Sequence, residues 1–98
     1  MKIRITLDID RSTTYDNVIS FCDAVGSNER LYQDVYDLEV VMVAHNRDLP
    51  ILLVALSTWF PHLTLSVACK TEREAMWVMT KMEEYDVDAV VYAREGLL

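Results

Sequence analysis

The side chains of this sequence that could do chemistry are two histidines and a cysteine. His45, His62 and Cys69 are candidate metal ligands or nucleophiles, but none belongs to a Cys-x-x-Cys or His-x-x-x-His spacing. Lys70 follows Cys69, and a neighbouring cation lowers the pKa of a thiol and makes it more nucleophilic. Because the sequence names no other partner for these residues, we expect loop histidines, with no metal, no cofactor and no enzyme activity.

Two pairs of aspartates are the other candidates for a catalytic or Mg²⁺ site. Asp8 and Asp10 lie at the end of the first predicted strand, whereas Asp86 and Asp88 precede the last one. A carboxylate metal site needs these oxygens to converge on one point. Neither antiparallel nor parallel strand pairing brings the two pairs together, so we expect Asp86 and Asp88 to form a turn.

The composition is that of a folded, acidic chain. The 98 residues carry 16 Asp and Glu against 9 Lys and Arg, a formal net charge of −7, and 52% of them are hydrophobic. The apolar share excludes an intrinsically disordered chain. The negative charge excludes a basic protein that binds nucleic acid through its phosphates. We expect a single domain over residues 1–98, located in the cytoplasm, with no direct contact to nucleic acid or membrane.

Hydrophobic periodicity predicts four strands and three helices. The predicted strands cover residues 2–8, 39–44, 63–68 and 89–93. The first predicted helix is capped by Ser12, Thr13 or Thr14 and ends before Gly26, and the other two cover residues 48–60 and 71–85. Their boundaries rest on Pro50 in a first turn, on Thr71 with Glu74 as a capping box, and on Gly26 just after a helix. The segment 29–38 fits both a helix and a strand.

Two sheet arrangements are compatible with this order of elements. Strict alternation of strands and helices is typical of a parallel α/β sheet. The strands at 2–8 and 63–68, however, each have one polar face, which is typical of an antiparallel sheet with helices on one side. We favour the second pattern, an α+β ferredoxin-like sandwich with a four-stranded sheet and helices mainly on one face. The alternative is a small parallel α/β sheet.

The segment 48–67 is similar to a known family pattern. The matching residues are Pro50, Leu56, Ser57, Phe60, Pro61, Leu63 and Thr64. They resemble the YubB-type ferredoxin-like domains of plasmid and phage proteins, in which a proline-initiated helix ends in Leu-Ser, then Phe-Pro, then Leu-Thr, and enters a strand. The resemblance implies a sandwich fold and a mobile-element source, and it implies no firm activity.

Apolar side chains predict a contact between copies of the chain. The predicted helix over 50–56 is apolar all the way round, and such a helix must be buried on most sides. Exposed Trp and Met are common interface anchors. We expect homodimerisation through Leu52, Trp59, Met76 and Trp77. The alternatives are that this helix is central in the domain, that a different partner covers its outer face, and that the two tryptophans simply cover the edge of the sheet.

Carboxylates interleaved with tyrosines predict a second contact surface. The residues of this predicted acidic face are Tyr32, Asp34, Tyr36, Asp37, Glu39, Glu83, Glu84 and Asp86. Spaced carboxylates imitate a phosphate backbone, and the net charge steers the chain toward a basic protein. We therefore expect an acidic protein-interaction module of phage or plasmid origin that inhibits a basic nucleic-acid-processing partner, such as a defence nuclease. The alternatives are a ferredoxin-like small-ligand regulatory or enzymatic domain, and a structural subunit.

Overall fold

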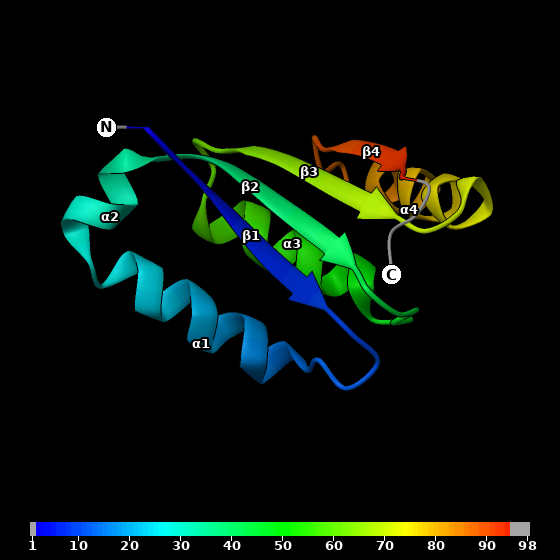
Figure 1. Ribbon diagram of the computed structural model, residues 1–98, viewed down its shortest axis with the longest axis horizontal. Helices are drawn as coiled ribbons and strands as arrows, with labels where there is room; N and C mark the ends of the chain where they lie inside the picture. Colours follow the sequence, from blue (N-terminus) through cyan, green and yellow to red (C-terminus); the bar gives the residue numbers. More distant parts are fainter. Residues whose placement is uncertain (1, 95–98) are drawn as a thin grey trace.

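The computed structural model describes residues 2–94 and has an α/β fold. Its elements are β1 (Ile3–Ile9), α1 (Tyr15–Gly26), α2 (Glu29–Asp34), β2 (Val35–Met42), α3 (Leu49–Trp59), β3 (Thr64–Cys69), α4 (Glu72–Glu84) and β4 (Val90–Ala93). The strands lie side by side in the order β1-β2-β3-β4, and each neighbouring pair is parallel (Figure 1). The chain therefore builds its sheet one strand at a time, in sequence order.

The parallel sheet agrees with the alternative prediction from the sequence, a small parallel α/β sheet. All three strand pairs are parallel, so the favoured ferredoxin-like sandwich is not confirmed. The polar face of β1 has another cause than antiparallel pairing. Arg4 and Thr6 are exposed, whereas Ile5 and Leu7 pack against the core, because helices cover only one side of the sheet.

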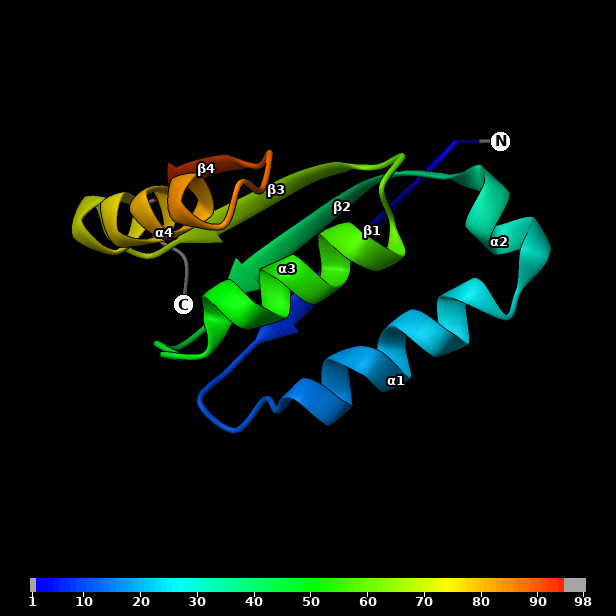
Figure 2. The same cartoon turned by 180° about the vertical axis from the view of Figure 1, so that it is seen from behind.

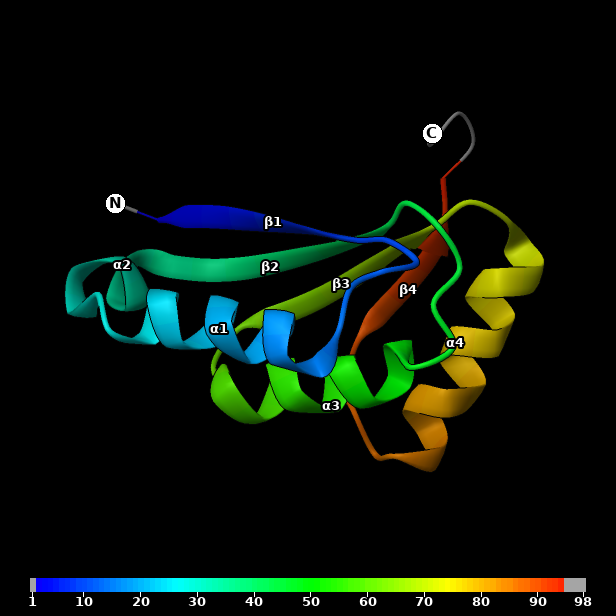
Figure 3. The same cartoon turned by 90° about the horizontal axis from the view of Figure 1, so that it is seen from below.

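The helices lie on one face of the sheet, as expected. The sheet lies in front of α3 in Figure 1, and α3 lies in front of the sheet when the molecule is seen from behind (Figure 2). Seen from below, α1, α3 and α4 all lie on the same side of the strands (Figure 3). Each connection between parallel neighbours has the same preferred hand, so consecutive crossovers in one direction put every helix on the same face.

The core fills the space between this face and the helices. Val40 of β2 and Val67 of β3 are fully buried, as are Leu52, Leu53 and Leu56 of α3. Helix α3 therefore lies at the centre of the helical layer, which explains why it is apolar on nearly every side.

Local sequence signals set most helix boundaries. The Thr14 hydroxyl accepts a hydrogen bond from the Asn17 backbone N–H, and the Asn17 side chain accepts one from the Thr14 N–H. The Thr71 hydroxyl caps α4 by accepting from the Glu74 N–H. Pro50 lies in the first turn of α3. These caps satisfy amide groups that would otherwise have no partner at the start of a helix.

The ambiguous segment 29–38 contains both kinds of structure in succession. Asn28 caps the six-residue helix α2, and β2 then begins at Val35, before the predicted start at residue 39. The helical and the alternating periods overlap because no turn separates the two elements. Gly26 is also placed differently from the prediction: it is the last residue of α1, and Ser27 is the C-cap.

Neighbouring residues of α3 provide a matched test of this packing. Leu52 is 0% exposed and Ile51 is 52% exposed. Leu52→Ala should lower the free energy of unfolding by about 2–5 kcal/mol, because it leaves a cavity in the core. Ile51→Ala should change the free energy by less than about 1 kcal/mol. Urea denaturation followed by circular dichroism measures both, and equal losses would contradict the orientation of α3.

Candidate functional site

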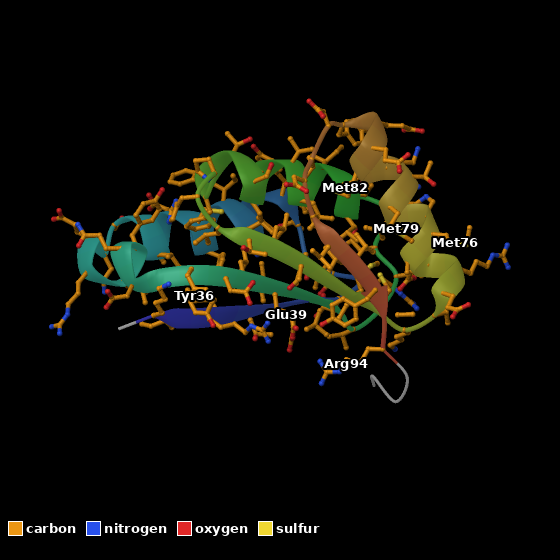
Figure 4. All side chains as sticks on the ribbon, turned by 90° about the horizontal axis from the view of Figure 1, so that it is seen from above. Tyr36, Glu39, Met76, Met79, Met82 and Arg94 are labelled. Carbon is orange, nitrogen blue, oxygen red and sulfur yellow. The ribbon has the colours of Figure 1, made fainter. Side chains whose placement is uncertain are left out.

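The face of the sheet opposite the helices carries polar side chains from several strands, and we call it the bare face. Figure 4 shows Glu39 and Arg94 on this side, away from the helices. The strand register places its residues in rows across the sheet. They are Arg4, Thr6, Asp8, Asp37, Glu39, Val41, Thr64, Ser66, Ala68, Val90 and Tyr92, with Arg94 directly after β4.

A network of charged groups centred on Glu39 crosses the bare face. The Arg4 Nε donates a hydrogen bond of 2.6 Å to Asp37 Oδ2, and Arg4 Nη1 lies 3.7 Å from Glu39 Oε2. The Tyr92 hydroxyl donates a 2.7 Å hydrogen bond to Glu39 Oε2. Arg94 Nη1 lies 3.7 Å from Glu39 Oε1. One carboxylate thus links β1, β2, β4 and the residue that follows β4.

The carboxylates of this network are buried and the guanidiniums are not. The Asp37 and Glu39 side chains are 9% and 11% exposed, whereas those of Arg4 and Arg94 are each 54% exposed. Buried carboxylates need charged partners, because an unpaired buried charge is strongly unfavourable. The hydrogen bond to Asp37 raises the pKa of Arg4, and the hydrogen bond to Glu39 raises the pKa of Tyr92. The arginines therefore form the outer layer of the network.

Two buried atoms of the bare face have no hydrogen-bond partner within residues 2–94. They are Asp37 Oδ1 and Ser66 Oγ, on the adjacent strands β2 and β3. Leaving such an atom unpaired costs about 1–3 kcal/mol. Asp37 Oδ1 can only accept a hydrogen bond when the carboxylate is charged, so only a donor could satisfy it.

The structure spreads the residues of the predicted acidic face over four regions. Asp37 and Glu39 lie on the bare face, within the arginine network. Tyr36 is exposed on β2, with the Lys2 ammonium 5.9 Å from its ring centroid. Tyr32 and Asp34 belong to α2, Glu83 and Glu84 end α4, and Asp86 lies in the loop before β4.

Tyr32 is largely engaged within the fold. Its ring packs against Phe60 and His62, with centroids 5.8 and 4.7 Å away. Its hydroxyl donates a hydrogen bond of 3.2 Å to the Trp59 carbonyl oxygen. Tyr32 therefore ties α2 to the end of α3.

The predicted self-association residues differ widely in exposure. Leu52 lies in the core at 0% exposed, whereas Trp59 is 38% and Met76 64% exposed. Trp77 is half-buried and packs against His45, with ring centroids 5.1 Å apart. Figure 4 shows Met76 on the outer side of α4. The exposed members thus lie at the ends of the helical layer and not in one patch with Leu52.

The histidines and cysteines do not converge. His62 contacts Tyr32 near the amino ends of the strands, whereas His45 follows β2 at their carboxyl ends. Both thiols are buried, and burial raises the pKa of Cys22 and of Cys69 to about 11. The suggestion that Lys70 lowers the pKa of Cys69 is not supported, because burial and the nearby Glu74 carboxylate both raise it. Within the part of the chain that the structure describes, no three His, Cys, Asp or Glu side chains are grouped to hold a metal.

A hollow of about 460 Å³ lies between the loop after β2 and the start of α4, and we call it the carboxyl-edge pocket. Its lining residues are His45, Arg47, Thr71, Arg73, Glu74 and Trp77. His45 Nδ1 lies 3.1 Å from Glu74 Oε2, so the carboxylate orients the imidazole ring. Of this set only His45 and Trp77 were predicted as candidate site residues, while Thr71 and Glu74 were predicted only as a helix cap; Arg4, Tyr92 and Arg94 were not predicted. The alternation of Arg4 with apolar residues was a usable signal for its outward position.

No family model, curated protein or solved structure matches this chain. The resemblance to YubB-type domains therefore stays a prediction. Among residues 2–94, no helix has the length and apolarity to span a membrane.

The two buried thiols predict a pH dependence of stability. The folded state favours the protonated thiol, because its pKa is raised from 9.0 to about 11. This contribution to stability is complete below pH 9 and is lost as the pH rises toward about 11. The urea midpoint should therefore fall between pH 9 and 11, and less so in the Cys22→Ala/Cys69→Ala variant. At pH 8 the native thiols should react slowly with a disulfide reagent such as DTNB, and rapid reaction would contradict their burial.

The network predicts that Arg4 stabilises the fold. Arg4→Met removes the charged donor from the buried Asp37 carboxylate and should lower the free energy of unfolding. Arg30→Met, at an exposed position of α2, is the matched control and should stay within about 0.5 kcal/mol. Urea denaturation at neutral pH compares them, and equal stabilities would show that the network contributes nothing.

Proposed function

We propose that this chain is a small acidic protein-interaction module that binds a basic protein partner through the bare face. The observation that carries the proposal is a parallel sheet with helices on one side only (Figure 3). Parallel sheets occur almost only with both faces covered. A partner that docks on the bare face would supply the missing layer.

The chemistry of the bare face favours a cationic partner. Its carboxylates, Asp8, Asp37 and Glu39, outnumber its guanidiniums, Arg4 and Arg94. Asp8 is exposed on this face, and a lysine or arginine of the partner could pair with its carboxylate. Arg4 and Arg94 already neutralise Asp37 and Glu39, so the exposed Asp8 is the carboxylate of this face that is left for a cation of the partner.

The whole-chain charge supports the same class of partner at longer range. A net charge of −7 steers a basic protein toward the chain and gives an association rate that falls with salt. Exposed carboxylates at Glu83, Glu84 and Asp86 add to this field. The proposed target is a basic nucleic-acid-processing protein, such as a nuclease, whose nucleic-acid groove is occluded. Action in the cytoplasm, without enzyme activity or cofactor, is part of the proposal.

A matched pair of substitutions tests the proposed surface. Thr64→Arg adds a cation and bulk beside Asp37 on the bare face, and Ser20→Arg adds the same group on the exposed side of α1. Both variants have the same net charge, so long-range steering is equal. A partner captured from host lysate and identified by mass spectrometry should be basic. Its affinity should fall about tenfold or more with Thr64→Arg and stay unchanged with Ser20→Arg.

Two outcomes would contradict the proposal. One is a captured partner that is acidic or that binds with no dependence on salt. The other is equal binding of the wild-type chain and Thr64→Arg, which would place the contact elsewhere on the molecule.

A contact between copies of the chain is a second proposal, supported by exposed methionines. Met76 and Met79 are 64% and 41% exposed and border a groove beside the edge strand β4. Light scattering after size exclusion should show a dimer at micromolar concentration, and Met76→Lys should convert it to a monomer. A wild-type chain that is monomeric under these conditions would contradict the dimer.

A further inference from the structure

The carboxyl ends of all four strands meet at one edge of the molecule. In a parallel sheet every strand ends on the same side, and open α/β sheets bind ligands outside these carboxyl ends. The loops after β1, β2 and β3 lie together at this edge (Figure 1). The position is therefore the one where this kind of sheet presents ligand-binding side chains.

Cations follow each strand at this edge, although the chain as a whole is acidic. Carboxylates outnumber cations 16 to 9 in the sequence. Yet Arg11 follows β1, Arg47 follows β2, Lys70 follows β3 and Arg94 follows β4. A cation thus follows each of the four strands, although Asp10, Asp48 and Glu72 lie in the same connections and Arg94 is engaged by Glu39.

The carboxyl-edge pocket brings one of these cations, Arg47, together with Arg73 of α4. Its volume of about 460 Å³ falls in the range of roughly 300–1,000 Å³ that is usual for small-molecule sites. Arg47 and Arg73 line it, both exposed and with no ion pair to any residue from 2 to 94. Glu74 is the one carboxylate of the lining, and it is engaged by His45. The unpaired charge in the pocket is therefore positive.

An aromatic wall accompanies the two guanidiniums. Trp77 is half-buried and packs beside His45, which fixes the indole ring at the side of the pocket. A flat ring of a ligand can stack on such an indole, as bases do on aromatic side chains. The backbone amides of α4 contribute less, because the Thr71 hydroxyl already caps the Glu74 N–H.

We infer that the carboxyl-edge pocket binds a nucleoside monophosphate, with the phosphate between Arg47 and Arg73 and the base against Trp77. Guanidinium groups pair with phosphate oxygens through two parallel hydrogen bonds, which suits two unpaired arginines. The pocket does not overlap the bare face, so this inference is independent of the proposed protein partner.

The test titrates the full chain with AMP, adenosine and inorganic phosphate. Trp59→Phe leaves Trp77 as the single tryptophan, and its fluorescence reports occupancy of the pocket. AMP should quench this fluorescence and bind about tenfold or more tightly than adenosine or phosphate alone, because it uses both the cations and the ring.

Substitutions locate the binding. Arg47→Gln and Arg73→Gln should each weaken AMP binding about tenfold, since each removes a charged donor. Trp77→Leu, followed by isothermal titration calorimetry, should weaken it about tenfold through lost stacking. Arg30→Gln is the matched control, an exposed arginine near the opposite edge, and should leave the affinity unchanged.

Three results would overturn the inference. The first is the absence of AMP binding to the wild-type chain. The second is an equal loss of affinity in Arg30→Gln and Arg73→Gln, which would indicate diffuse charge attraction. The third is tighter binding of a single-stranded oligonucleotide than of AMP, which would indicate a polymer site.

Discussion

The structure depends on one constraint: a parallel sheet that is built in sequence order has all its crossovers on the same side. Consecutive strands β1 to β4 pair in order, so every helix lies on one face. That face forms the core around Leu52, Leu53 and Leu56, and the opposite face is left to side chains alone. Parallel sheets are normally covered by helices on both faces. Here one face of the described fold has no helix over it, and its side chains are largely polar, so that this face can lie against solvent.

The bare face carries charged side chains in place of the apolar ones that a covering helix would need. Asp37 and Glu39 are buried at 9% and 11% exposed, and Arg4 and Arg94 cover them. Pairs of this kind are costly to desolvate and are weak evidence for stability by themselves. They do leave a defined pattern of donors and acceptors, with the Asp8 carboxylate exposed on the same face. That pattern is the physical basis of the proposed recognition of a basic protein.

The sequence predicted the elements better than it predicted how they are assembled. Capping at Thr71 and the proline start of α3 are local effects, and both were visible in the sequence. The direction of the strands could not be predicted from the sequence. A polar face arises equally from antiparallel pairing and from a parallel sheet that helices cover on one side. The charged network was harder to predict than the strands. Arg4 pairs with Asp37 because the register between β1 and β2 shifts at Ile3 and Arg4, and no local sequence pattern encodes such a shift. Likewise, the charge of Lys70 suggested a reactive Cys69, whereas tertiary burial decides its pKa.

The central claim is that the bare face is a contact surface for a basic protein. The most direct measurement is a backbone amide NMR map of the labelled chain with and without the purified partner. The account predicts that the largest shifts fall on Thr6, Ser66 and Tyr92, which lie on the bare face in two adjacent rows of the strand register. Shifts concentrated on α1 and α3, with these strand residues unchanged, would contradict it.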